Sequence, residues 1–304
     1  MPKTIAMGLT HAGTVRTRNE DAFFLLDKTV AGRSDGVQSH AAHSEGPVQF
    51  FAIADGMGGR GVGDAAAQAA LNALDAARRQ IRQPDRFEFQ TFARDFLQRA
   101  AQAVQDVLQN GRGLHAGASM TLLCLTDESG YVLSLGNCRC YRMRDGRLSR
   151  LTEDDIVPDT SPRRLSRYLG QPPGEQPAGS PQVLRFDLCQ EDLFLLTSDG
   201  FTDAVDESVI AAWMSTPSAF AGKPGQMMNR VLNGEARDNV TFLLLRILDP
   251  AGSASDSGQP VRQVRHRPPS RFQVRSGVLR AILILIACVL TGFVAGLLVL
   301  TLFF

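Results

Sequence analysis

The sequence predicts an α+β fold in which two mainly antiparallel sheets form the centre of a four-layer αββα sandwich. Short runs rich in Val, Ile, Leu and Phe alternate with long stretches rich in Ala, Gln and Arg over residues 1–249. The order is strands, then two consecutive long helices, then a meander of strands. That order favours antiparallel sheets with helices packed outside over a strictly alternating α/β fold. Two sheets placed between pairs of helices would accommodate the predicted number of strands and helices.

Each element has its own local signal. Apolar runs of strand length, bounded by Gly, Asp, Asn or Ser, predict strands at 5–9, 22–26, 48–54, 119–125, 131–135, 138–143, 183–186, 193–197 and 240–247. Ala-rich periodic stretches predict long helices at 62–82 and 88–110, and shorter ones at 206–214 and 224–232. Residues 28–47 are polar and predict an enlarged loop. Its two histidines, His40 and His43, lack the third ligand that a metal site there would need.

Charge and cysteine content exclude several classes of protein. The first 250 residues hold 26 basic and 30 acidic residues, a net charge of −4, so the body is no general nucleic-acid binder. With 44% hydrophobic residues the chain is no disordered polyelectrolyte either. Five scattered cysteines, an odd number, argue against a disulfide framework and favour a reducing cytosol.

The C-terminal part predicts a membrane anchor. Residues 281–304 run for 24 positions without a charge, and a helix of that length spans about 36 Å, more than a hydrocarbon core of about 30 Å. We therefore expect a catalytic body at 1–249, a basic Pro-, Ser- and Arg-rich linker at 250–278, and a single transmembrane helix at 279–304. Six arginines between Arg262 and Arg280 place the body on the cytoplasmic side of the membrane.

Two further features of this C-terminal part bear on partners. The linker arginines lie beside the predicted span, so anionic lipid head groups are favoured over nucleic acid as their partner. Gly292 and Gly296 match the small-residue motif through which transmembrane helices dimerise. Because glycine is common in such helices, a homodimer through this face and a monomeric anchor both stay open.

Acidic residues follow or precede four predicted strands. Asp55, Asp199 and Asp238 each stand beside a strand end, and the segment Asn19-Glu20-Asp21 precedes another. Taken singly, each is explained by turn or capping preferences. If the sheets bring these ends together, like charges at close range require raised pKa values or bound cations. Oxygen ligands without a histidine cluster favour Mg²⁺ or Mn²⁺.

The joint order of these segments resembles the metal-dependent Ser/Thr protein phosphatases of the 2C type, in particular the bacterial branch. The resemblance extends over nearly all of residues 4–248. The matching segments are GTVRTRNEDA (13–22), DGMGG (55–59), LSRLTED (148–154), LLTSDGFTD (195–203) and DNVT (238–241).

The resemblance implies a site for two divalent cations, Mn²⁺ or Mg²⁺. In it Asp55 would bridge both cations, the Gly56 carbonyl would bind one of them, and Asp199 and Asp238 would hold the other. The implied metal site as a whole comprises Glu20, Asp21, Asp55, Gly56, Asp199 and Asp238.

The implied catalytic residues are Arg16, Asp55 and Asp199. Arg16 would grip the substrate phosphate, because a guanidinium offers two parallel donors and keeps its charge. The cations would lower the pKa of a bridging water, and the resulting hydroxide would displace the Ser or Thr oxygen in line.

The sequence also departs from the family pattern. Family members usually carry Gly-Asp-Ser-Arg where this chain has Gly136-Asn137-Cys138-Arg139, and in bacterial members that acid helps to bind a third metal. An amide is a poorer ligand, so the third site is weakened here. Only twelve residues, 153–164, stand where the family inserts a longer flap, which predicts a more open cleft.

Two functions follow from these observations. The first is a membrane-tethered phosphatase that removes phosphate from Ser or Thr of proteins, on the cytoplasmic side of the bacterial inner membrane. Its expected partners are phosphoproteins and a membrane-associated Ser/Thr kinase, since confinement to one membrane raises their effective concentration. The alternative is a catalytically weak, phosphatase-like, membrane-tethered binding module. Retention of Asp55, Asp199, Asp238 and Arg16 favours the enzyme.

Overall fold

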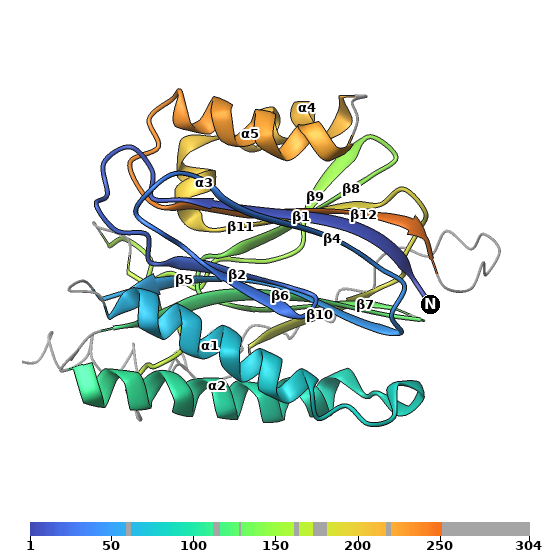
Figure 1. The fold of residues 1–304 in the computed structure, drawn as a ribbon, viewed down its shortest axis with the longest axis horizontal. Coiled ribbons are helices and arrows are strands. Elements are labelled where there is room, and N and C mark those ends of the chain that lie inside the picture. Colours follow the sequence, from blue (N-terminus) through green and yellow to red (C-terminus); the bar gives the residue numbers. More distant parts are fainter. Residues whose placement is uncertain are drawn as a thin grey trace, which may run out of the picture. The chain divides into compact units, whose positions relative to one another are not determined.

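Two six-stranded sheets lie face to face at the centre of the fold, and every pair of neighbouring strands is antiparallel (Figure 1). The computed structural model describes residues 1–58, 62–111, 116–127, 129–160, 164–172, 181–216 and 220–250. The first sheet has the order β4 (Gln38–Ser44), β1 (Lys3–His11), β12 (Val240–Asp249), β11 (Leu193–Thr197), β8 (Arg139–Arg144) and β9 (Arg147–Arg150). The second has the order β10 (Gln182–Phe186), β7 (Gly130–Leu135), β6 (Gly117–Thr126), β5 (Val48–Met57), β2 (Asp21–Leu25) and β3 (Lys28–Ala31).

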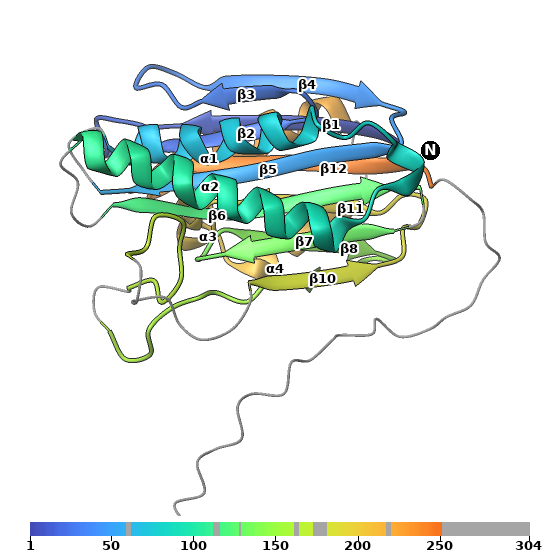
Figure 2. The ribbon, with the colours of Figure 1, turned by 90° about the horizontal axis from the view of Figure 1, so that it is seen from below.

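Helices cover the outer face of each sheet, as Figures 1 and 2 show from two directions. The second sheet is covered by α1 (Gly63–Arg78) and α2 (Phe89–Gly111), with the short 3-10 helix η1 (Pro84–Arg86) between them. The first sheet is covered by α3 (Asp199–Ala204), α4 (Glu207–Ser215), η2 (Phe220–Gly222) and α5 (Lys223–Leu232). The predicted four-layer order of helices, sheet, sheet and helices is confirmed.

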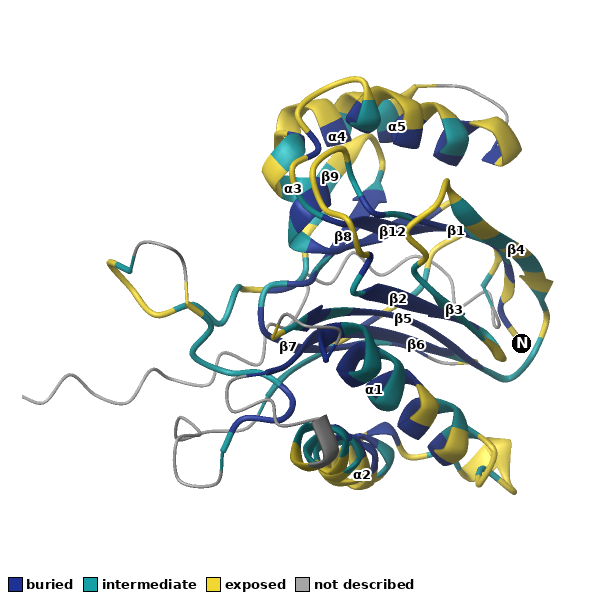
Figure 3. Cartoon of the chain, turned by 60° about the vertical axis from the view of Figure 1, so that its left-hand side comes forward, coloured by how far each residue is buried: buried dark blue, intermediate teal, exposed yellow. Residues whose placement is uncertain are grey.

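Three hydrophobic layers hold these four layers together. One lies between the two sheets and includes Phe23, Phe51 and Phe194, and the other two lie between each sheet and its helices. The inner faces of the helices and most of each sheet are accordingly buried (Figure 3). Because the central strands are covered on both faces, they read as continuous apolar runs rather than alternating ones.

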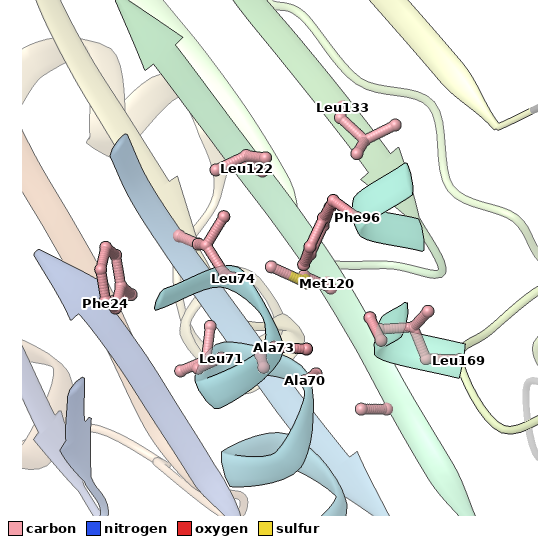
Figure 4. Close-up of a cluster of buried hydrophobic side chains, with 14 of the residues drawn as sticks. Phe24, Ala70, Leu71, Ala73, Leu74, Phe96, Met120, Leu122, Leu133 and Leu169 are labelled. Carbon is pink, nitrogen blue, oxygen red and sulfur yellow. The ribbon is translucent and has the colours of Figure 1, made fainter. Parts of the chain in front are cut away.

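Helix α1 packs on the second sheet through a face made mainly of small residues. Its buried positions recur every three or four residues, the spacing of one helix face. Ala70, Leu71 and Leu74 lie on this face, close to Phe24 and Met120 of the sheet (Figure 4). Alanines allow the helix to approach the strands closely, and this places the start of α1 against the end of β5.

The prediction of a polar loop at residues 28–47 is wrong, because this segment contains the strands β3 and β4. Each is an edge strand, and β4 alternates half-buried and exposed residues along its length. Its backbone pairs with β1, and His40 and His43 lie opposite Gly8 and Ile5. An edge strand needs few apolar side chains to be held by backbone hydrogen bonds, so its sequence carries a weak signal. The short elements β9 and α3 were also not predicted.

The predicted C-terminal anchor lies outside the described residues. Within the residues that the structure describes, no helix is both long enough and apolar enough to span a bilayer. The expected helix at 279–304, its Gly292 and Gly296, and the linker beyond Pro250 all fall in the part that is not described.

Candidate active site

The acidic residues that the sequence singled out meet at one end of both sheets, because of how the strands run. Asp21 begins β2 and Asp55 lies near the end of β5, and the antiparallel register of these strands puts the two residues directly opposite each other. Asp199 follows β11 and Asp238 precedes β12, which is the neighbouring antiparallel strand. The end of one strand and the start of its antiparallel neighbour share one edge of the sheet, so all four acids lie together.

Burial and mutual repulsion disfavour the charged forms of the inner carboxylates. Burial, followed by the charges of Asp21, Asp199 and Asp238, raises the pKa of Asp55 well above its usual range. Burial also raises the pKa of Asp21 to about 7, with repulsion from Asp199 and Asp238 adding to the effect. The pKa of Asp199 is raised as well, chiefly by burial.

One oxygen of Asp21 is in an unusual position. Asp21 is 2% exposed, and its Oδ2 has no hydrogen-bond partner among the described residues. A buried polar atom without a partner costs free energy, and a carboxylate oxygen costs more than a neutral one. A cation in the cluster would compensate both this oxygen and the repulsion between the carboxylates. Carboxylates and backbone carbonyls are the donors that Mg²⁺ and Mn²⁺ prefer, so the residues present fit such ions.

Asp238 and Asp199 each accept a hydrogen bond from a neighbouring side chain. Asp238 accepts a hydrogen bond from Arg16 Nη2 at 2.7 Å, and this ion pair is about half exposed on both sides. Asp199 accepts one from Asn137 Nδ2, also at 2.7 Å. Accordingly, no three His, Cys, Asp or Glu side chains of the described segments already form a complete metal-binding set. The predicted ligands lie at the same end of both sheets, and two of them are engaged by Arg16 and Asn137.

Glu20 and Gly56 lie where β2 and β5 meet the start of α1. The Gly56 N–H donates to the Glu20 carbonyl at 3.2 Å. The Glu20 carboxylate lies beside Gly63, the first residue of α1. Burial and the charge of Asp64 raise the pKa of Glu20. Both residues therefore border the cluster, as the resemblance implied, and their roles toward a metal stay predictions.

Asn239 is a structural residue of the site that sequence reasoning missed. Its Nδ2 donates to the carbonyls of Ala12 and Arg18 at 3.0 and 2.7 Å, and its Oδ1 accepts from the Glu20 N–H at 2.8 Å. One amide thereby ties the loop that carries Arg16 to the start of β12. The only signal for Asn239 in the sequence is its place beside Asp238, and only Asp238 was predicted to bind a metal.

A sandwich of two antiparallel sheets, with acidic loops gathered at one end, is the architecture expected of a metal-dependent phosphatase of the 2C type. The family model described as protein phosphatase 2C matches residues 32–235. The chain belongs to the protein phosphatase 2C family.

Two curated relatives agree with this assignment. The serine/threonine protein phosphatase PstP of Mycobacterium tuberculosis (strain H37Rv) is 24% identical over 248 residues, which is 78% of this chain and 44% of PstP. The chain thus spans less than half the length of PstP. Protein phosphatase PhpP of Streptococcus pneumoniae (strain D39) is 22% identical over 253 residues, covering 78% of this chain and 95% of PhpP.

The solved structures bear on the fold. The catalytic domain of PstP in complex with two manganese ions superposes with a TM-score of 0.62 at 21% identity, covering 81% of this chain and 100% of that one. A serine/threonine phosphatase of S. agalactiae has a TM-score of 0.66 at 17% identity, covering 80% and 99% of the two chains. Both likenesses establish the shared fold.

Proposed function

We propose that this chain hydrolyses phosphoserine and phosphothreonine on proteins, using two divalent cations of the Mn²⁺ or Mg²⁺ class. The observation that carries the proposal is the meeting of acids from four separate chain segments, with the buried Asp21 directly opposite the half-buried Asp55. Such a cluster is stable as anions only with cations present. Family membership and the named activity of PstP and PhpP support the same reaction.

Each residue has a proposed part in holding the cations or the substrate. When bound, two divalent cations neutralise phosphoryl oxygens and lower the pKa of water at the site. Asp55 would be the central residue to hold them, and Asp199 and Asp238 would hold one from the neighbouring sheet. Glu20, Asp21 and the Gly56 carbonyl would supply further oxygen donors.

Arg16 is proposed to bind the phosphate of the substrate. Its side chain is 56% exposed and lies beside Asp238 at the rim of the cluster, on a loop between β1 and β2. A guanidinium keeps its charge and presents parallel N–H donors, which suits a phosphate monoester. The ion pair with Asp238 would hold Arg16 at the rim of the cluster, where its guanidinium could meet a phosphate.

The test is phosphate release from a phosphothreonine peptide by the full-length chain, with Mn²⁺ and with a chelator. We expect release that depends on Mn²⁺ and is abolished by Asp199→Asn. Asp145→Asn is the control, because this exposed residue lies in the β8–β9 hairpin at the opposite end of the sheet. Absence of release from a folded chain with Mn²⁺ would overturn the proposal and favour the catalytically weak, phosphatase-like, membrane-tethered binding module.

We also propose that the enzyme is held at the cytoplasmic face of the bacterial inner membrane by residues 279–304. Support comes from the 24 uncharged residues at 281–304 and from the six arginines before them. A membrane-associated Ser/Thr kinase or its targets are the class of partner that such an anchor would concentrate.

Vesicle flotation tests this location. We expect the full-length chain to float with liposomes in high salt, and the double substitution Leu290→Arg with Val294→Arg to prevent flotation. Each charge near the centre of a span costs roughly 2.5–3.5 kcal/mol on insertion scales. The anchor would be contradicted if the doubly substituted chain floats, or if the native chain does not float.

A further inference from the structure

Asn137 lies at the start of β8 and reaches across to the acidic cluster. It belongs to the tight turn that joins β7 to β8, and its Nδ2 donates to Asp199 Oδ2 at 2.7 Å. An amide N–H donates to a carboxylate and does not compete with it for a cation, and Asp199 also lies within reach of Asp55. A hydrogen bond to a charged acceptor is stronger than one between neutral groups, so this contact can hold the carboxylate in one orientation.

A buried serine fixes the turn that carries Asn137. Ser119 is 2% exposed, and its Oγ accepts the N–H groups of Asn137 and Cys138, both at 2.9 Å. Gly136 has a φ of +92°, and a Cβ there would lie 2.6 Å from the same Oγ. The turn therefore requires glycine at 136 and is packed tightly on Ser119.

The turn is also fixed from its other side. Asp155 Oδ2 accepts the Gly136 N–H at 3.1 Å, and the Asp155 N–H donates to the Gly136 carbonyl at 2.8 Å. Ser119 itself lies on β6 directly opposite Asp55. Ser119 thus fixes the turn that carries Asn137 and also pairs with Asp55, whereas Asp199 comes from the other sheet.

We infer that Asn137 is a positioning residue, whose amide orients the Asp199 carboxylate for cation binding across the gap between the two sheets. This inference rests on the proposed function for the identity of the cation site. The hydrogen bond depends on the amide of Asn137: in the metal-free chain, an aspartate at 137 would place a second acceptor against Asp199 Oδ2, and the hydrogen bond would become a repulsion.

Calorimetric titration of Mn²⁺ into the metal-free full-length chain tests the inference. Asn137→Ala is expected to weaken Mn²⁺ binding about tenfold, which corresponds to about 1.4 kcal/mol. At saturating Mn²⁺, kcat returns to within about twofold of the native value, because Asn137 acts only through Asp199. Thr126→Ala is the matched control, since it removes hydrogen bonds of a loop at the far end of β6 and leaves Mn²⁺ affinity unchanged.

A second variant, in which the side chain keeps its size, is expected to change Mn²⁺ affinity in the opposite direction. Asn137→Asp is expected to lower the thermal midpoint of the metal-free chain and to tighten Mn²⁺ binding, because the added charge repels Asp199 and attracts cations. If both variants alter the metal-free midpoint but leave Mn²⁺ affinity at the native value, Asn137 is only a structural residue and the inference is overturned.

The same titration separates this inference from the proposed function. A tenfold loss of Mn²⁺ affinity in Asn137→Ala, in a chain that releases no phosphate, sustains the positioning role and overturns the phosphatase. If both variants release phosphate at the native rate and bind Mn²⁺ with unchanged affinity, the phosphatase is sustained and the positioning role is overturned. A native chain that binds no Mn²⁺ overturns the positioning role.

Discussion

Asp55→Asn is expected to reduce Mn²⁺-dependent phosphate release by roughly 10²–10³-fold, the size of effect seen when one electrostatic group of an active site is removed. Asp55 is the acid that faces Asp21 on the same sheet and Asp199 from the other sheet. An amide at this position keeps the shape of the side chain but supplies one neutral oxygen in place of a carboxylate. Initial rates over a range of Mn²⁺ concentrations measure the loss.

The same substitution is expected to stabilise the metal-free protein. The pKa of Asp55 is raised in the fold, so folding disfavours its charged form, and the free energy of unfolding falls as the pH rises from the ordinary pKa of an aspartate up through the raised one. A neutral amide removes this cost at neutral pH. With chelator present, the thermal midpoint should rise by about 2–4 °C for each kcal/mol gained.

With Mn²⁺ present, the native chain should have a higher thermal midpoint than Asp55→Asn. Cation binding to the native chain raises its midpoint by mass action, and Asp55→Asn gains little because its affinity is reduced. Asp145→Asn, on the exposed β8–β9 hairpin, should match the native chain in both conditions. A metal-free midpoint that falls in Asp55→Asn would show that the carboxylate is satisfied by the protein alone, and the two-cation proposal would lose its main support.

The sequence predicted the centre of the fold better than its edges, for a physical reason. The strands β5, β6 and β11 are covered on both faces, so burial requires continuous apolar runs that are visible in the sequence. The strands β3 and β4 lie at edges, where backbone pairing with one neighbour holds polar residues in place. Nothing in their composition distinguishes such strands from loops.

The site shows the same division. The acids beside strand ends were predictable, because a carboxylate next to a buried strand is conspicuous and strand topology determines where it lies. Asn239 and Ser119 were not, since each acts on groups brought near only by the fold: Asn239 bonds to residues more than 200 positions away. Asn137 was noticed as a departure from the family pattern, and its bond to Asp199 became visible only in the structure.

Gly56→Ala is expected to lower the free energy of unfolding by about 1–3 kcal/mol, the usual effect of overpacking, and to reduce phosphate release by about 100-fold. A Cβ on Gly56 would lie 1.9 Å from the Gly63 carbonyl oxygen and 2.8 Å from the Glu20 carbonyl oxygen. Both are backbone atoms, so no side-chain rotation relieves the contact. The start of α1 or the end of β5 must move, and either shift displaces Asp55 or Glu20.

Gly225→Ala provides the matched control, because a Cβ on Gly225 in α5 has no atom within 4 Å. Alanine is the better helix former by roughly 0.5–1 kcal/mol, so this variant should be slightly more stable than the native chain, with unchanged phosphate release. Chemical denaturation and initial rates, measured on both variants, compare the two glycines directly. If Gly56→Ala retains native stability and activity, the contact between β5 and α1 does not fix the geometry of the acidic cluster, and α1 only covers the sheet.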